Sequence, residues 1–236
     1  MNKKYELTDD VKEWLGHKLY RIKALISFGV VVEGELGGYV EKEENLSQKG
    51  NAWVFGNAEV CGDAEVTGNA VVTGNAKVWG NAKVTGKAEV SGNAEVSANA
   101  KLNGSVKVCD AAWVFDNAEV SGKAEVTGNA WVSGNAKVSG NTKVYDGARV
   151  GGKATVSGKA KVYGNAEVSG NAKVYGSAEV YDSAEVLDNA NVYGDAKVYG
   201  EAWVCDDAKV SGEAKVHGEA HVFGGMKVTG VKDVCE

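Results

Sequence analysis

One six-residue unit, Ala-x-Val-x-Gly-Asn, dominates this sequence and repeats without interruption from Ala52 to Val234. Valine occupies every sixth position from Val54 onward, with a single exception at Leu102. The alanine position, two residues earlier, is nearly as regular and departs only at Val106, Thr142, Met226 and Lys232. A strict short period without inserted loops predicts a repeat architecture in which successive units stack.

The hexad has a simple physical interpretation. Alanine and valine are two positions apart, so both point to the same side of an extended segment while the residue between them points away. The Gly-Asn pair suits a tight turn, because glycine adopts positive φ freely and asparagine tolerates it. Each hexad therefore predicts one short strand and one corner. Since one unit cannot bury its apolar face alone, the units are expected to coil and stack.

The repeat resembles that of the hexapeptide-repeat family, which folds as a left-handed parallel β-helix. That family's repeat places a small residue four positions after an aliphatic one, as at Val138 and Thr142 and at Val168 and Ala172. The resemblance implies that three hexads form one triangular coil, so that residues 18 apart stack. We therefore expect an all-β, left-handed solenoid of roughly ten coils. Solenoids with periods of five or nine residues do not fit.

Residues 1–50 lack the repeat and are expected to form a small β-rich cap on a β-helix that spans residues 51–236. Such a cap would cover the open end of the solenoid and prevent end-to-end stacking. Within the cap, Thr8 is a candidate N-cap for one helical turn that ends near Trp14.

Strand signals follow this turn. Alternation and β-branched residues predict a strand over residues 19–26 and a further β segment at residues 30–32. Residues 34–40 are interpreted as a first, imperfect pair of hexads, because Leu36 lies 18 residues before Val54. We accordingly expect Leu36 to stack with Val54.

The composition excludes several classes of protein. A net charge of −6, with Lys and Glu interspersed, gives no indication of nucleic-acid or membrane binding. No apolar run is long enough to span a bilayer, and no signal-peptide core follows the first residues. The four cysteines each follow the valine position and form no Cys-x-x-Cys pair: Cys61, Cys109, Cys205 and Cys235. We expect them to face outward and to be reduced, in a cytoplasmic protein.

Sorting the outward positions by the 18-residue coil separates three faces. The first carries an aromatic column, Tyr145, Tyr163, Tyr181 and Tyr199, which continues to His217 and Cys235. Rings one coil apart are close enough to stack. The column is therefore either a ladder that stabilises the solenoid or a platform for the rings of sugars, bases or a partner protein.

The second face is the most apolar. It carries Trp79, Trp113, Phe115, Trp131, Leu187, Trp203 and Phe223. Exposed aromatic residues gathered on one side are typical of an interface. Because enzymes of the resembled fold trimerise side to side, we expect a homo-oligomer, a trimer or a dimer, with a foreign partner as the alternative.

The third face carries a row of lysines, which includes Lys137, Lys173 and Lys209, flanked by Ser and Thr hydroxyls. This row is either a solvated surface or a strip that binds a small anionic ligand.

Catalytic groups are sparse. The resemblance implies acyltransferases that use CoA or acyl-carrier-protein donors and a histidine general base. His217 and His221 are the only candidates, no acid is evidently placed to orient them, and the frame leaves no loop for a donor pocket. Zinc carbonic anhydrases of the same fold need three histidine ligands, which this pair and His17 do not supply. Corner aspartates are interpreted as turn residues: Asp110, Asp116, Asp182, Asp188 and Asp206.

The sequence thus favours a non-enzymatic scaffold that binds partners, including copies of itself, without a metal or cofactor. One alternative is a phage-type sequestering or inhibitor protein that binds a small anionic ligand or a host protein. A further alternative is an acyltransferase of the resembled family.

Overall fold

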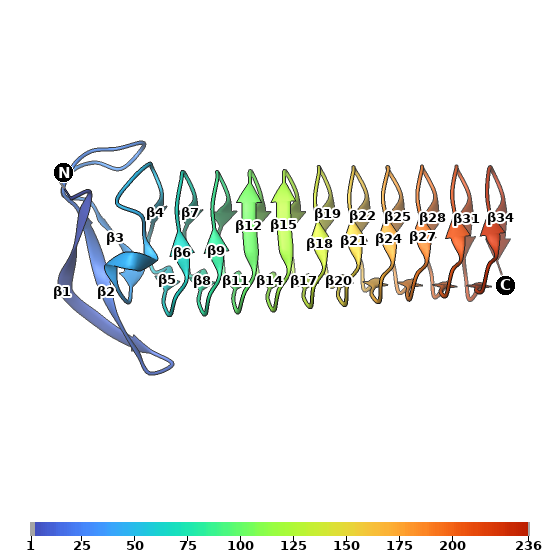
Figure 1. The fold of residues 1–236 in the computed structure, drawn as a ribbon, viewed down its shortest axis with the longest axis horizontal. Coiled ribbons are helices and arrows are strands. Elements are labelled where there is room, and N and C mark those ends of the chain that lie inside the picture. Colours follow the sequence, from blue (N-terminus) through green and yellow to red (C-terminus); the bar gives the residue numbers. More distant parts are fainter. Residues whose placement is uncertain (1–2, 236) are drawn as a thin grey trace. The chain divides into compact units, whose positions relative to one another are not determined.

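Most hexads fold into a two-residue strand followed by a corner. In the computed structural model, which describes residues 3–235, the strand consists of the valine and the outward residue before it. Successive strands lie on three sides of a coil, so the fold is an all-β parallel β-solenoid, as predicted (Figure 1). The chain divides into two compact units, the first ending at Asp116 and the second beginning at Asn117.

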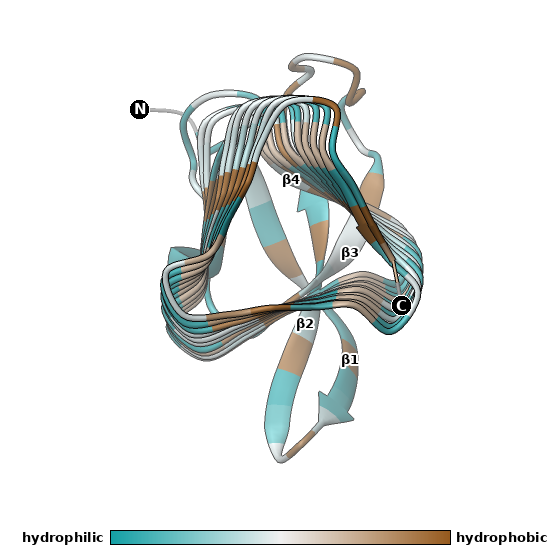
Figure 2. Ribbon diagram, turned by 90° about the vertical axis from the view of Figure 1, so that its right-hand side faces the viewer, coloured by the Kyte–Doolittle hydropathy of each residue, from teal (hydrophilic) through white to brown (hydrophobic). Residues whose placement is uncertain are grey.

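Residues 18 apart stack in register within each unit. In the second unit, Val144 pairs with Val162, and Val162 pairs with Val180, all in parallel. The Lys161 N–H donates to the Ala178 carbonyl of the next coil at 2.9 Å. The alanine and valine side chains of the repeat point inward, and almost all are fully buried. Figure 2 shows these apolar positions recurring on each side of the coils.

Three sheets form the sides of the first unit, named Trp, Tyr and Lys sides after the three predicted faces. The Trp side has the order β1 (Tyr5–Trp14), β2 (His17–Ala24), β3 (Leu36–Val40), β5 (Glu59–Val60), β8 (Lys77–Val78), β11 (Glu95–Val96) and β14 (Trp113–Val114). The Tyr side contains β4 (Trp53–Val54), β7 (Val71–Val72), β10 (Glu89–Val90) and β13 (Lys107–Val108). The Lys side contains β6 (Glu65–Val66), β9 (Lys83–Val84) and β12 (Lys101–Gly104). A short 3-10 turn, η1 (Glu43–Asn45), precedes the first regular coil.

The second unit has the same three sides. Its Trp side contains β17 (Trp131–Val132), β20 (Arg149–Val150), β23 (Glu167–Val168), β26 (Glu185–Val186), β29 (Trp203–Val204) and β32 (His221–Val222). Its Tyr side contains β16 (Glu125–Val126), β19 (Lys143–Val144), β22 (Lys161–Val162), β25 (Glu179–Val180), β28 (Lys197–Val198), β31 (Lys215–His217) and β34 (Asp233–Cys235). Its Lys side contains β15 (Glu119–Gly122), β18 (Lys137–Val138), β21 (Thr155–Val156), β24 (Lys173–Val174), β27 (Asn191–Val192), β30 (Lys209–Val210) and β33 (Lys227–Val228).

The corner aspartates have the turn conformation that the sequence predicts. Asp182 and Asp206, for example, have φ of 59° and 56°. Each carboxylate also accepts a hydrogen bond from a backbone N–H of the next coil, from Gly200 at 3.2 Å and from Gly224 at 3.0 Å. Aspartate therefore tolerates the left-handed corner and adds a contact that glycine lacks.

The N-terminal residues form a hairpin rather than the predicted helical turn. β1 and β2 pair in antiparallel fashion along their length. Leu15 and Gly16 join them in a two-residue turn with φ of 47° and 81°, the positive values that match the twist of a hairpin. The Thr8 N-cap prediction is wrong because pairing with β2 outweighs a local capping signal. The strand predicted over residues 19–26 is confirmed as β2, with its bounds moved toward the N-terminus.

The first coil has a different register from the coils that follow. Val40 of β3 pairs with Val60 of β5, an offset of 20 residues rather than 18. Leu36 pairs instead with β2, and 51% of its surface is exposed. The predicted stacking of Leu36 with Val54 is therefore wrong, because β3 belongs to the Trp side and Val54 to the Tyr side, and the chain from Val40 to Val54 is two residues longer than two hexads.

Residues 30–32 do not form the predicted strand. Val31 makes one isolated bridge with Phe28, and the valines on either side of it are exposed. Side chains hold this backbone: the N–H of Val32 donates to the Glu35 carboxylate at 3.0 Å. The segment is a closed turn, so its β-branched residues have no neighbouring strand to pair with.

Candidate functional site

The Tyr side of the second unit carries a continuous aromatic column. The rings of Tyr145, Tyr163, Tyr181 and Tyr199 stack nearly parallel at centroid distances of 4.8 to 4.9 Å. The His217 ring continues the column at 4.8 Å from Tyr199. The spacing equals that between neighbouring strands, so the coil itself imposes the stack. The predicted stacking of these residues is confirmed.

Charged side chains run beside this column. The Glu179 carboxylate lies 2.8 Å from the Lys161 ammonium and 3.5 Å from that of Lys197. The hydrogen bond from Lys161 contributes most to lowering the pKa of Glu179. Burial, followed by the charge of Glu179, raises the pKa of Tyr163 to about 12. The column thus presents neutral phenols next to a mixed row of ions.

The tryptophans of the Trp side differ in exposure. Trp79 packs edge-to-face on Trp14 of the hairpin, with ring centroids 6.0 Å apart, and is half-buried. Exposure is 39%, 39% and 43%, respectively, at Trp113, Trp131 and Trp203. Only part of the predicted aromatic face is therefore available to a partner, because the hairpin covers Trp79.

Neighbouring rings lie against two of these tryptophans. Phe115 meets Trp113 edge-on at a centroid distance of 6.4 Å. The His221 ring, one coil along from Trp203, stacks on it at 5.4 Å with an interplanar angle of 27°. His221 therefore belongs to the aromatic row of the Trp side.

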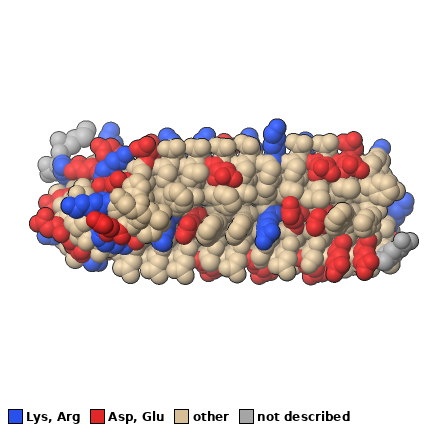
Figure 3. Space-filling view, turned by 90° about the horizontal axis from the view of Figure 1, so that it is seen from below, with Lys and Arg blue, Asp and Glu red and all other residues tan. Residues whose placement is uncertain are grey.

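The Lys side of the second unit combines cations with amides. Lys173, Asn191 and Lys209 pair in register on β24, β27 and β30. With further lysine and asparagine side chains and one aspartate, they line an open depression of about 540 Å³. Lys137, in contrast, lies 3.7 Å from the Glu119 carboxylate. The charges on the Trp side are mixed as well: along the lower face, where β5, β8 and β11 run in Figure 1, acidic and basic side chains are interspersed among uncharged ones (Figure 3).

His217 has an acidic partner that the sequence did not reveal. Its Nε2 atom lies 2.7 Å from Oδ1 of Asp233. Asp233 pairs in register with Lys215, so it reaches His217 diagonally from the next strand. Comparing positions 18 apart misses such diagonal contacts, and the expectation that no acid is placed near this histidine is wrong. His217 and Cys235 pair in register, as predicted.

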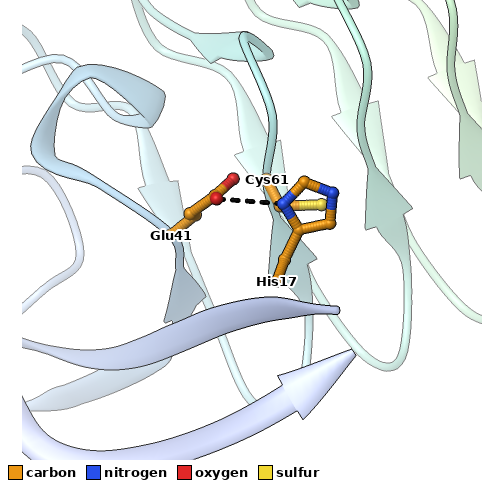
Figure 4. A group of neighbouring side chains, drawn as sticks. All are labelled: His17, Glu41 and Cys61. Carbon is orange, nitrogen blue, oxygen red and sulfur yellow. Dashed lines mark hydrogen bonds and ion pairs between the residues drawn. The ribbon is translucent and has the colours of Figure 1, made fainter. Parts of the chain in front are cut away.

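The structure also brings together three residues that lie far apart in the sequence. His17 begins β2, Glu41 follows β3 and Cys61 follows β5, and these strands are neighbours on the Trp side. His17 Nδ1 lies 2.9 Å from Glu41 Oε1 (Figure 4). One ligand atom from each residue lies within 4.8 Å of the other two. The second Glu41 oxygen accepts the Gly62 N–H at 2.6 Å.

Cys61 is buried, so the prediction that its side chain faces solvent is wrong. Only 1% of Cys61 is exposed, because the hairpin covers this part of the first coils. Burial, with the nearby charges of Glu41 and Glu59, raises the pKa of the Cys61 thiol to about 12. Burial also acts to raise the pKa of Glu41, but hydrogen bonds from His17 and Gly62 outweigh it and the pKa is lowered. Burial and the neighbouring carboxylates therefore disfavour the thiolate, which is the nucleophilic form of cysteine.

These surfaces define a parallel β-solenoid with three chemically distinct sides. No protein-family model matches this chain, and no curated protein matches its sequence. Among residues 3–235, no helix is both long enough and apolar enough to cross a membrane.

Proposed function

We propose that this chain is a non-enzymatic binding solenoid that self-associates through its Trp side. The observation that supports the proposal is the exposure of Trp203, at 43%, and of Phe223, at 51%, on one side of the second unit. Trp203 lies on β29, and Phe223 directly follows β32, the strand that pairs with β29. Trp131, at 39%, adds a third exposed ring from β17 of the same unit.

Aromatic rings in this setting favour burial against another protein. Homodimer interfaces are more apolar than the remaining surface and enriched in aromatic residues. The sides of a solenoid are flat and built from paired strands, so two of them can meet without rearrangement. The proposal also includes a left-handed coil, membership of the hexapeptide-repeat family and assembly as a trimer or a dimer. The resemblance of the repeat to that family supports the hand and the membership, and the exposed aromatic residues support the assembly.

Sedimentation velocity on the full chain tests the proposal. We expect the wild-type protein to sediment as a trimer or a dimer and the double variant Trp131→Lys/Trp203→Lys to sediment as a monomer. The matched control is Thr155→Lys/Asn191→Lys, which adds the same charges at outward positions of the Lys side. A wild-type monomer at high concentration, or a control that also dissociates, would contradict the assignment of the Trp side.

A second candidate function is the sequestration of a small anionic ligand on the Lys side. The depression around Lys173, Asn191 and Lys209 supports it, since ammonium and amide groups there can both donate to oxyanions. Tripolyphosphate is a suitable calorimetric probe, and we expect Lys173→Gln/Lys209→Gln to abolish its binding. The control Lys143→Gln/Lys161→Gln, on the Tyr side, should bind as the wild type does. Equal losses in both variants would indicate only nonspecific attraction.

A further inference from the structure

We propose that His17, Glu41 and Cys61 form a site for one divalent transition-metal ion of the zinc class. The residues supply an imidazole nitrogen, a carboxylate oxygen and a sulfur, the three ligand types that zinc takes from proteins. Their ligand atoms already lie within 4.8 Å of one another, and His17 Nδ1 and Glu41 Oε1 are 2.9 Å apart (Figure 4). Tetrahedral zinc with ordinary bond lengths needs ligand separations of about 3.3–3.6 Å.

The site is built on paired strands. Val40 and Val60 pair in register, so Glu41 and Cys61 are the next residues along two neighbouring strands, β3 and β5. His17 starts β2, at the end of the two-residue hairpin turn. The adjustment that zinc requires is at most about 1.5 Å between ligand atoms. It falls on the side chains of His17 and Glu41. These side chains are 39% and 29% exposed, so they can rotate, and an ion can enter from solvent.

The charges around Cys61 favour the binding of a cation. The buried Cys61 sulfur and a Glu41 carboxylate oxygen lie within 4.8 Å of each other, so the negative charges of a Cys61 thiolate and the Glu41 carboxylate would repel each other. A divalent ion would offset these charges, and a coordinating thiol loses its proton to solvent as the metal–sulfur bond forms. The Gly62 N–H, at 2.6 Å from the second Glu41 oxygen, would hold the carboxylate in place.

A second cluster, Asp188, Cys205 and Asp206, serves as an internal comparison. Its ligand atoms also lie within 4.8 Å of one another, but both aspartates are exposed corner residues. Their carboxylates accept hydrogen bonds from backbone N–H groups of the next coil, from Asp206 at 3.4 Å and from Gly224 at 3.0 Å. This cluster lacks an imidazole and is explained by corner structure, so we assign the site to His17, Glu41 and Cys61 alone.

The test is a cobalt titration of the full chain, after treatment with a chelator and in the presence of a non-thiol reductant. We expect one equivalent of Co²⁺ to saturate a near-ultraviolet thiolate-to-cobalt charge-transfer band, and Zn²⁺ to displace it. Cys61→Ser should remove the band, while the matched control Cys205→Ser should retain it. His17→Gln should weaken Co²⁺ binding at least tenfold, in keeping with the loss of a ligand.

The result that overturns the proposal is the absence of a band in the wild type, or a band that survives in Cys61→Ser and disappears in Cys205→Ser. Should Cys61→Ser fail to fold, His17→Gln decides the matter, because its side chain is partly exposed at the end of the hairpin. Unchanged Co²⁺ affinity in that variant would also reject the site. None of these outcomes depends on the oligomeric state.

Discussion

The N-terminal segment and the second unit bury apolar surface in different ways. In residues 3–53 the core contains large side chains, among them Tyr5, Leu19, Ile22 and Trp53. In residues 117–235 the buried apolar side chains are alanines and valines alone. The N-terminal core therefore depends on a few individual residues, whereas the core of the second unit distributes its stability over equivalent coils.

The polar contacts of the N-terminal segment and of the second unit differ in the same way. In the N-terminal segment, the buried Lys4 ammonium donates to the Ala52 carbonyl at 2.9 Å. The Tyr5 hydroxyl lies 2.8 Å from the Glu43 carbonyl and 2.7 Å from that of Leu46. In the second unit, the recurring contacts are ladder hydrogen bonds and stacked rings. A repeat thus multiplies one contact many times, while a non-repeating segment needs several contacts that each occur once.

The largest difference should appear when one core side chain is truncated in each region. Trp53 is fully buried and meets Phe28 edge-on at 5.3 Å, so Trp53→Ala should cost about 3–5 kcal/mol in the free energy of unfolding. Val168→Ala in the second unit should cost about 2 kcal/mol, because it removes less buried surface. Hydrogen exchange read by mass spectrometry should show faster exchange of residues 3–60 in Trp53→Ala. If both variants lost the same free energy of unfolding and both exchanged faster along the whole chain, the two regions would not differ in how they are stabilised.

The aromatic column should contribute the next largest effect. Tyr181 stacks on two rings at 4.9 Å, so Tyr181→Leu should cost about 1–2 kcal/mol. Tyr145 stacks on one tyrosine, and Tyr145→Leu should cost about half as much. Chemical denaturation of both variants measures the ratio. Equal losses would mean that the rings contribute through burial of area and not through stacking.

A single imperfection of the repeat should be correctable. Thr142 occupies an alanine position, is fully buried, and its hydroxyl has no hydrogen-bond partner. Thr142→Val removes the hydroxyl and keeps the shape, so it should stabilise the protein by about 1 kcal/mol. Thr155→Val, at a partly exposed outward position, is the matched control and should leave the thermal midpoint nearly unchanged. A destabilised Thr142→Val would indicate a hidden partner for the hydroxyl.

The last predicted effect concerns the pH dependence of stability in the N-terminal segment. Burial lowers the pKa of Lys4 from 10.5 to about 8. Between these values the unfolded chain binds more protons than the folded one, so the contribution of Lys4 to stability rises with pH and levels off near 10.5. The thermal midpoint of the wild type relative to Lys4→Met should therefore increase from pH 7.5 to pH 10. A constant difference would show that the amine is not desolvated.

Much of the fold can be predicted from the sequence because the hexad is repeated. Once Ala and Val are assigned to one side of a strand, each later hexad adds the same information, and the three sides follow from the three-hexad coil that the family resemblance implies. The tyrosine column and the corner aspartates were predictable for this reason. The diagonal contact of Asp233 with His217 was missed because the period relates positions within a column and not between columns.

The N-terminal segment offers no such redundancy. The Thr8 N-cap signal was local, and pairing of β1 with β2 outweighed it. The offset of 20 residues between Val40 and Val60 depends on the length of the connection that follows β3, which no hexad marks. The burial of Cys61 depends in turn on a hairpin whose path the sequence does not indicate.

The sequence by itself determined the hexad and the inward positions of alanine and valine, because these follow from periods of two and six residues, and the resemblance to three-hexad coils then sorted the outward residues into sides. Only the tertiary structure decided that Trp79 is covered, that His217 meets Asp233 and that His17, Glu41 and Cys61 converge. Each of these outcomes joins segments that no period relates. The physical reason is that local alternation determines the direction of a side chain, whereas its neighbours depend on the register between strands distant in the chain.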